Sequence, residues 1–165
     1  MAKLKRSAHA LYVDANMGKT PTKWYRIGTD IEELNVDLGA DVEVTKNILD
    51  ETSVNLNGYE PSIEASPYKA NPDDEIYAPL KAAAMDRVMD EAHCKTKMLE
   101  VIIEDDTASS YDAWEQDCYL IPQSVGGDTS GFQIPFNLQP EGERTKGTAT
   151  ITNKVPSFTA GTVSP

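Results

Sequence analysis

The chain has 165 residues, and 27 acidic against 15 basic side chains give it a formal charge of −12. Its length fits one domain, because domains commonly hold roughly 100–200 residues. Such an acidic chain is not expected to hold nucleic acid by its phosphates, since that affinity comes mainly from Lys and Arg. Anionic membrane surfaces would repel it, and no apolar run approaches the ~20 residues that span a bilayer.

The charge is unevenly distributed along the chain. Residues 1–30 carry +4, residues 31–128 carry −17 and residues 129–165 carry +1. A basic start and an acidic middle could attract each other between copies, although a solvated acidic surface with an ordinary basic terminus explains the same numbers. Two cysteines, Cys94 and Cys118, do not make a disulfide framework, which favours a reducing cytoplasm.

Apolar and polar residues alternate with a period of two over much of the chain, which predicts strands. In chain order, strands are expected at 6–13, 23–28, 31–48, 52–66, 97–105, 114–124, 132–139 and 147–152. If the two segments that flank the turn Leu49-Asp50-Glu51 pair, they form a long hairpin. Its free edges would need blunting or pairing with another chain.

One helix is expected over residues 72–91. Asn71 can cap it, Pro72 suits its first turn, and the acidic residues 73–75 favour the positive end of its dipole. Pro79 either kinks the helix or moves its true start to residue 78. The predicted fold is therefore mainly β (α+β), a β-sandwich or barrel with a long hairpin and one flanking α-helix. Residues 1–155 are expected to form a single domain with a basic N-terminal arm (1–8), and residues 156–165 an extended C-terminal arm.

Motifs that carry chemistry are weak in this chain. Gly18-Lys19-Thr20 resembles the end of a phosphate-binding loop, but position 13 is Val where that loop needs Gly. His93-Cys94 is the one suggestive metal or nucleophile pair, and a zinc site needs about four ligands. The acidic turn at 104–106 lacks the spacing of an EF-hand. We therefore expect no catalytic residues, no metal, no cofactor and no enzymatic activity.

The segment from residue 27 to about 77 carries a more specific pattern. Its parts are Ile27-Gly28, Asp41-Val42-Glu43-Val44-Thr45, Ile48-Leu49-Asp50-Glu51, Gly58-Tyr59-Glu60-Pro61 and Tyr68-Lys69-Ala70-Asn71-Pro72-Asp73. Their order resembles the major tail proteins of long-tailed bacteriophages of the siphophage type, especially those of Gram-positive hosts. Ala70 departs from the Gly that this family often has before an Asp-Pro pair. The remainder of the chain shares the order of elements more weakly.

The resemblance implies a tail tube subunit, a structural virion protein that self-assembles into stacked hexameric rings. In the family, each subunit gives four strands to a barrel around the lumen, the helix packs outside, and DNA leaves the capsid through the tube. The implied partners are further copies of the chain, the tail terminator, tape measure and baseplate proteins, and genomic DNA in transient, non-specific contact. Assembly would occur in the host cytoplasm without membrane insertion. Tubes of contractile tails and related injection systems fit the same pattern.

A wall past which DNA slides is expected to be acidic, because carboxylates repel phosphate. The predicted lumen-facing acids are Asp37, Asp41, Glu43, Glu64, Asp117 and Asp128, each of which could instead lie on an outer surface or an interface. The predicted inter-subunit or inter-ring residues are Lys3, Lys5, Arg6, Asp50 and Glu51. The alternative is a β-sandwich carbohydrate- or receptor-binding module of a phage or cell surface, which would use exposed aromatic residues or a calcium loop. Trp24 and Trp114 are available for such a site, and each is as well explained as core.

Overall fold

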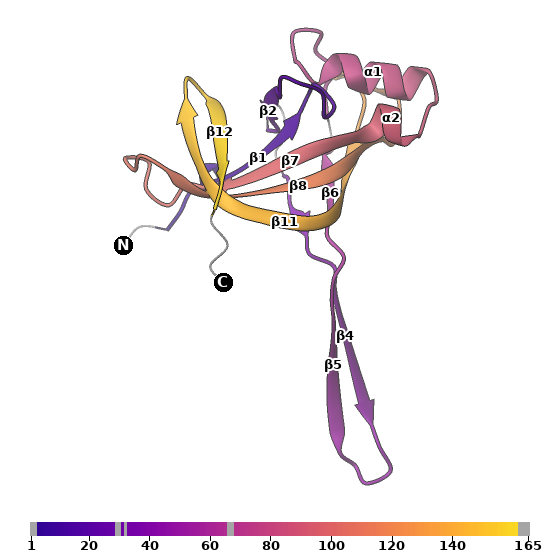
Figure 1. Ribbon diagram of the computed structural model, residues 1–165. Coiled ribbons are helices and arrows are strands. Elements are labelled where there is room, and N and C mark those ends of the chain that lie inside the picture. Colours follow the sequence, from indigo (N-terminus) through magenta and orange to yellow (C-terminus); the bar gives the residue numbers. More distant parts are fainter. Residues whose placement is uncertain (1–2, 29–30, 32, 66–67, 162–165) are drawn as a thin grey trace.

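The computed structural model describes residues 3–28, 31, 33–65 and 68–161, and antiparallel strands make up most of it (Figure 1). Eight of the described strands form one sheet in the order β2-β1-β7-β8-β11-β6-β3, with β12 paired to β11 outside that path. Their bounds are β1 (His9–Asp14), β2 (Trp24–Arg26), β3 (Val36–Asp37), β6 (Ser62–Ala65), β7 (Lys95–Ile102), β8 (Tyr111–Pro122), β11 (Phe136–Thr152) and β12 (Val155–Ala160). The predicted mainly β fold is confirmed.

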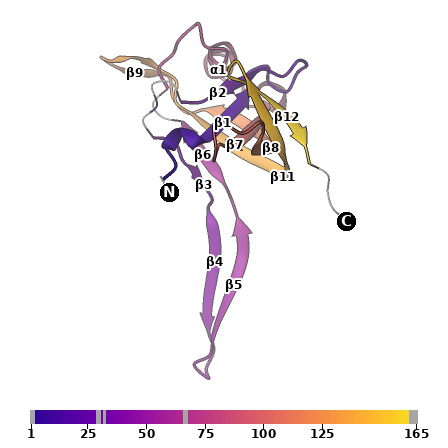
Figure 2. The same ribbon diagram turned by 90° about the vertical axis from the view of Figure 1, so that its left-hand side faces the viewer.

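A separate hairpin projects away from this sheet (Figures 1 and 2). It consists of β4 (Ala40–Lys46) and β5 (Thr52–Tyr59), which pair with each other as the alternating pattern predicted. The predicted strand 31–48 is divided into β3 and β4 at Gly39, whose positive φ of 54° turns the chain out of the sheet. A Cβ at this position would lie 2.3 Å from the carbonyl oxygen of Glu60, so only glycine fits this crossing.

The longest strand, β11, combines two strands that the sequence pattern kept apart. Its register against β8 shifts between Glu141 and Thr145, where Gly142 has a φ of 73°. Such a bulge bends a strand and strengthens its twist. Pro135 lies just before β11 and separates it from β10 (Gly131–Gln133), which forms a small ribbon with β9 (Gly126–Asp128).

The helical part is shorter than predicted. The 72–91 helix is wrong in extent, because α1 covers Tyr77–Met85 and α2 covers Glu91–Cys94. Asn71 accepts a hydrogen bond from the amide of Asp73 in a local turn and caps no helix. Pro79 is the third residue of α1, where its missing N–H costs nothing. The alternative start near residue 78 is thus close to the observed one.

Two apolar clusters lie on opposite faces of the sheet. The helix-side core packs α1 against residues such as Leu11, Met98, Leu120 and Phe136, all less than 2% exposed. The second core consists of residues next to these in the same strands, for example Leu99 beside Met98. Side chains of β2 and β12 pack against it. Successive strand residues point to opposite faces, so one strand contributes side chains to both cores.

The terminal segments are more integrated than the predicted arms. Residues 156–160 of the expected C-terminal arm belong to β12, which pairs with β11 over six positions from Thr152↔Val155 to Gly147↔Ala160. Residues 162–165, and residues 1–2 of the N-terminal arm, lie outside the described residues. The rest of the N-terminal arm includes a 3-10 turn, η1 (Arg6–Ala8), whose Arg6 donates hydrogen bonds to the backbone oxygens of His9 and Leu34.

Candidate functional surface

On the side opposite the helix-side core, the part of the sheet beyond the second core is polar, and we call this the acidic face. Cross-strand pairing fixes its members, because residues directly opposite each other share a face. Asp117 of β8 pairs with Lys97 of β7 on one side and with Glu141 of β11 on the other. Further along, Asn137 of β11 pairs with Glu64 of β6.

The same face continues to the edge of the sheet. Ser62 of β6 pairs with Asp37 of β3, two residues from Glu64 and therefore on the same side. Alternation explains why these carboxylates face outward, since Ile63 between Ser62 and Glu64 is 1% exposed in the helix-side core. The structure therefore brings three of the six predicted lumen-facing acids, Asp37, Glu64 and Asp117, onto one surface.

Negative charge outweighs positive charge on the acidic face. Its carboxylates are Glu33, Asp37, Glu64, Glu115, Asp117 and Glu141, and its ammonium groups are Lys95 and Lys97. The Lys95 Nζ lies 3.3 Å from Glu91 and 3.9 Å from Glu141, and the Lys97 Nζ lies 3.9 Å from Glu115. The hydrogen bond that Lys95 donates to Glu91 and the negative charge of Glu91 raise the pKa of Lys95. Both lysines are thus matched by neighbouring carboxylates.

The remaining acids of the face keep their charge uncompensated. Within the described residues, Asp37, Glu64 and Asp117 take part in no ion pair, and all three are exposed. Asp37 and Glu64 line a hollow of about 450 Å³ together with Glu33, Asn35 and Ser62. Three carboxylates around one open hollow repel any phosphate that approaches it.

The other three predicted lumen-facing acids lie elsewhere. Asp41 and Glu43 belong to β4 and stand on the projecting hairpin, away from the sheet (Figure 1). Asp128 lies at the end of β9, where its Oδ1 accepts hydrogen bonds from the amide and hydroxyl of Ser130. These bonds lower the pKa of Asp128. The sequence pattern therefore grouped residues that the fold separates.

The predicted inter-ring residues fall at two distant places. Lys3 and Lys5 are exposed near the N-terminus, whereas the guanidinium of Arg6 is engaged with backbone oxygens. Asp50 and Glu51 lie at the far turn of the hairpin. There Asp50 is 3.5 Å from Lys46 in an exposed ion pair, and Glu51 accepts a hydrogen bond of 2.7 Å from the side chain of Asn47.

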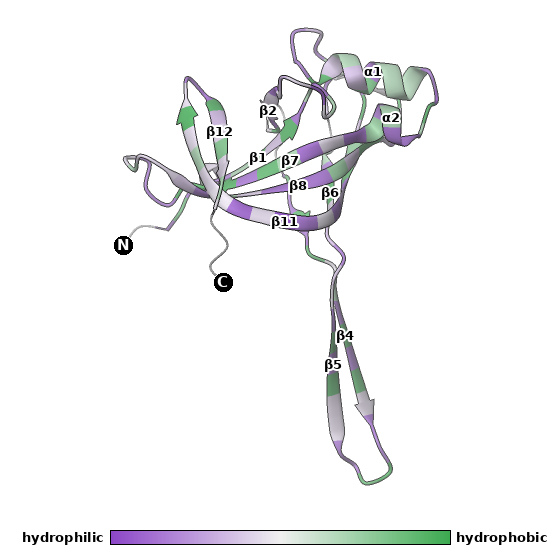
Figure 3. Cartoon of the chain, in the orientation of Figure 1, coloured by the Kyte–Doolittle hydropathy of each residue, from purple (hydrophilic) through white to green (hydrophobic). Residues whose placement is uncertain are grey.

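The sequence pattern did not reveal that the hairpin carries an exposed apolar face. Val42 pairs with Leu56 and Val44 with Val54, so the four side chains are neighbours on one side of the ribbon. They are between 51% and 79% exposed, and Figure 3 shows the hydrophobic positions along the ribbon. Alternation predicted that these residues share one face of a strand, but it did not show whether that face is covered. The signal against a core position was the length of the two segments, which exceeds what the sheet can cover.

An ionic cluster centred on the buried carboxylate of Glu100 lies next to the helix-side core, and its partners His9 and Arg144 are partly exposed. Glu100 is 8% exposed and accepts hydrogen bonds from His9 Nε2 at 2.9 Å and from Arg144 at 2.8 Å. Burial alone would raise the pKa of Glu100, but these two partners outweigh it and lower the pKa. The guanidinium of Arg144 also lies 5.8 Å from the ring centre of Trp114. This arrangement joins β1, β7 and β11 and leaves the Trp114 ring partly covered.

The cysteines are buried and reduced. Burial raises the pKa of Cys118 to about 12 and also raises the pKa of Cys94, so both are thiols at neutral pH. His93 is exposed and bonded to Asp90 at 2.6 Å, separate from the buried sulfur beside it in sequence. In the described part of the chain no three His, Cys, Asp or Glu side chains are grouped to hold a metal ion.

No model of a protein family matches the chain, and no curated protein sequence matches it either. Among the described residues, no helix combines the length and apolarity needed to cross a membrane.

Proposed function

We propose that this chain is a structural subunit of a phage tail tube, which assembles into stacked hexameric rings and lets DNA slide through an acidic lumen. The observation that carries the proposal is the acidic face. Its lysines are neutralised by adjacent carboxylates, while Asp37, Glu64 and Asp117 remain free of ion pairs in the described residues. A wall of this kind gives phosphate nothing to bind, since affinity for DNA comes from Lys and Arg that displace counterions.

The projecting hairpin supports assembly with further copies. β4 and β5 pair only with each other among the described strands, so each keeps one row of backbone groups without a strand partner. An exposed apolar ribbon with free edges is a liability in a lone chain. Contact with a neighbouring copy would cover it, and stability drawn from neighbours fits an apolar share of only 39%.

We also propose the partners and the location of such a subunit. Its partners are further copies of this chain, the proteins that terminate, measure and anchor the tail, and genomic DNA in transient contact. It works in the virion without catalysis. Both thiols are protonated at neutral pH, which agrees with a structural role.

Electron microscopy of the purified protein tests the assembly. We expect six-fold rings or tubes at high protein concentration, and light scattering should show large particles that disappear on dilution. A monodisperse monomer at millimolar concentration would contradict the proposal, because a tube subunit must recognise its own copies.

Charge reversal tests the role of the acidic face. The face variant replaces three free acids by lysine, Asp37→Lys, Glu64→Lys and Asp117→Lys. The control makes the same change in charge at exposed acids outside the face, Asp73→Lys, Asp86→Lys and Asp106→Lys. Tubes of the face variant should retain linear duplex DNA in a salt-dependent manner, and control tubes should release it. Equal retention by both variants would refute a lumen position for the face.

A further inference from the structure

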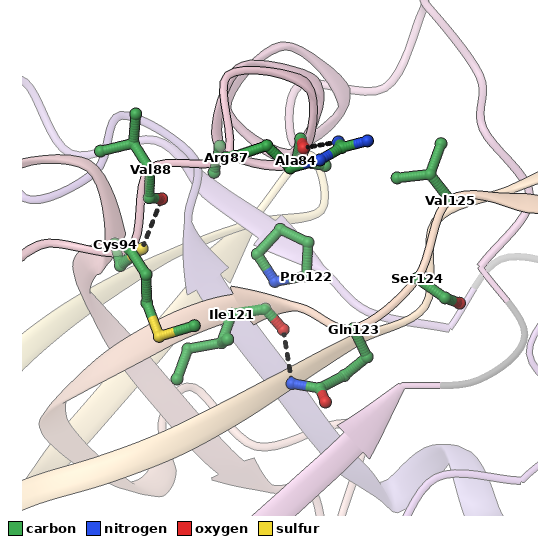
Figure 4. A pocket seen from close by; sticks show the side chains of 11 residues that line it. Ala84, Arg87, Val88, Cys94, Ile121, Pro122, Gln123, Ser124 and Val125 are labelled. Atoms are coloured by element: carbon green, nitrogen blue, oxygen red, sulfur yellow. Dashed lines mark hydrogen bonds between the residues drawn. The ribbon is translucent and has the colours of Figure 1, made fainter.

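A cavity of about 490 Å³ opens between the C-terminal end of α1 and the segment that follows β8. Figure 4 shows Ala84 and Val88 on one side and Ile121, Pro122 and Val125 on the other. The lining is mainly apolar, and Met89 beside it is 76% exposed. The cavity therefore suits aliphatic side chains.

One cation lies at this cavity. Arg87 follows α1 with a φ of 55°, and its guanidinium donates to the backbone oxygen of Ala84 (Figure 4). Its side chain is exposed, and it takes part in no ion pair within the described residues. An occupant with aliphatic side chains and an adjacent carboxylate would complement both features.

The tip of the hairpin has this chemistry. Ile48 is 99% exposed and Leu49 is 71% exposed, and the carboxylates of Asp50 and Glu51 follow directly. The turn is ordered before any contact, because Asn47 Oδ1 accepts hydrogen bonds from the amides of Leu49 at 2.8 Å and Glu51 at 3.1 Å. An ordered turn loses little conformational freedom on docking.

We propose that the hairpin tip of one copy docks into this cavity of a neighbouring copy, with Ile48 and Leu49 in the apolar part and Asp50 or Glu51 facing Arg87. This assignment rests on the proposed function and names the two surfaces that join the copies. A chain cannot fill its own cavity, because the tip and the helices lie at opposite ends of the molecule in both views (Figures 1 and 2). Two different surfaces make a heterologous contact, which propagates from copy to copy.

The exposed ion pair at the tip does not oppose docking. Lys46 and Asp50 are 62% and 85% exposed in their side chains, so their pairing in water is weak. The Asp50 carboxylate can therefore exchange Lys46 for Arg87 at small cost. The apolar pair supplies the driving force, since each side chain leaves water on docking.

Removal of the apolar tip is the first test. The variant Ile48→Ser with Leu49→Ser changes only exposed side chains and should fold normally by circular dichroism. We expect its self-association to weaken by at least about tenfold, because two aliphatic side chains no longer leave water. The matched control Val155→Ser removes a 58% exposed valine of β12 and should assemble like the unmodified chain.

Disulfide trapping is the second test. With Leu49→Cys and Val125→Cys in one chain, mild oxidation by copper phenanthroline should give a ladder of covalent multimers. The native thiols are buried and should not react. A control with Leu49→Cys and Ala108→Cys places the second thiol in an exposed loop outside the cavity and should give no ladder.

The outcomes separate this inference from the proposed function. If the unmodified chain forms rings or tubes and the serine variant forms them equally well, or the cavity cysteine gives no ladder, the docking assignment is wrong while the tube proposal stands. If the unmodified chain stays monomeric at high concentration, both are wrong.

Discussion

Replacement of Asp14 by alanine should cost the fold several kcal/mol. Asp14 ends β1 and is fully buried. Its carboxylate accepts backbone hydrogen bonds from Asn16 at 2.9 Å, Lys23 at 3.0 Å and Gly18 at 3.1 Å. The side chain thereby fixes the loop between β1 and β2, and Asp14→Ala leaves all three donors without their acceptor.

The magnitude follows from these three bonds. Hydrogen bonds to a charged group contribute roughly 1.5–3 kcal/mol each. Gly18 and Lys23 lie in an exposed part of the loop, so water can replace the carboxylate at those two donors. We therefore expect a loss of about 3 kcal/mol in the free energy of unfolding. For a chain of this size that corresponds to a fall in Tm of roughly 6–12 °C.

Urea unfolding followed by tryptophan fluorescence measures this loss. The midpoint should fall while the slope m stays constant, since the unfolded chain exposes the same surface. Asp112→Ala serves as the control, because Asp112 is an exposed carboxylate on β8 and should change the midpoint little. A change of less than about 0.5 kcal/mol for Asp14→Ala would show that the carboxylate does not fix this loop.

Three further predictions concern pH, the hairpin and the N-terminus. Because the pKa of Glu100 is lowered in the folded chain, its carboxylate stabilises the fold above the ordinary glutamate pKa, and this stability is lost as the pH falls through the lowered pKa. Glu100→Gln should therefore flatten the dependence of the unfolding free energy on pH between 7 and 3. An unchanged dependence would contradict this. Gly39→Ala places a Cβ against the carbonyl oxygen of Glu60 and should abolish amide-exchange protection in the hairpin but not in β8. Protection retained in both would contradict the close contact between Gly39 and Glu60. Lys3→Glu with Lys5→Glu should weaken assembly if the basic N-terminus meets an acidic surface of a neighbour, and unchanged light scattering would exclude that contact.

Strand identity could be predicted from the sequence because alternation reports directly which residues share a face. It located the hairpin, including its turn near Asp50, and the strands that carry Glu64 and Asp117. Long-range pairing could not be predicted the same way. The bulge at Gly142 merges two patterns into β11, and residues 156–160, which look like a tail in sequence, gain hydrogen bonds only because β11 lies beside them.

The candidate surface was predictable only in part, for a related reason. A period of two shows that Asp37 and Glu43 alternate with apolar neighbours, but it does not show which apolar side finds a core. The turn at Gly39 directs the hairpin into solvent, so Val42 and Val44 remain exposed there while Ile63 is buried in the sheet. That direction depends on the contact with Glu60, which is distant in sequence.

A cryo-electron microscopy reconstruction of assembled tubes would show whether the acidic face lines a DNA conduit. We expect the carboxylates of Asp37, Glu64 and Asp117 to point into the central channel in every subunit. A reconstruction with these side chains on the outer wall or between rings would contradict this expectation.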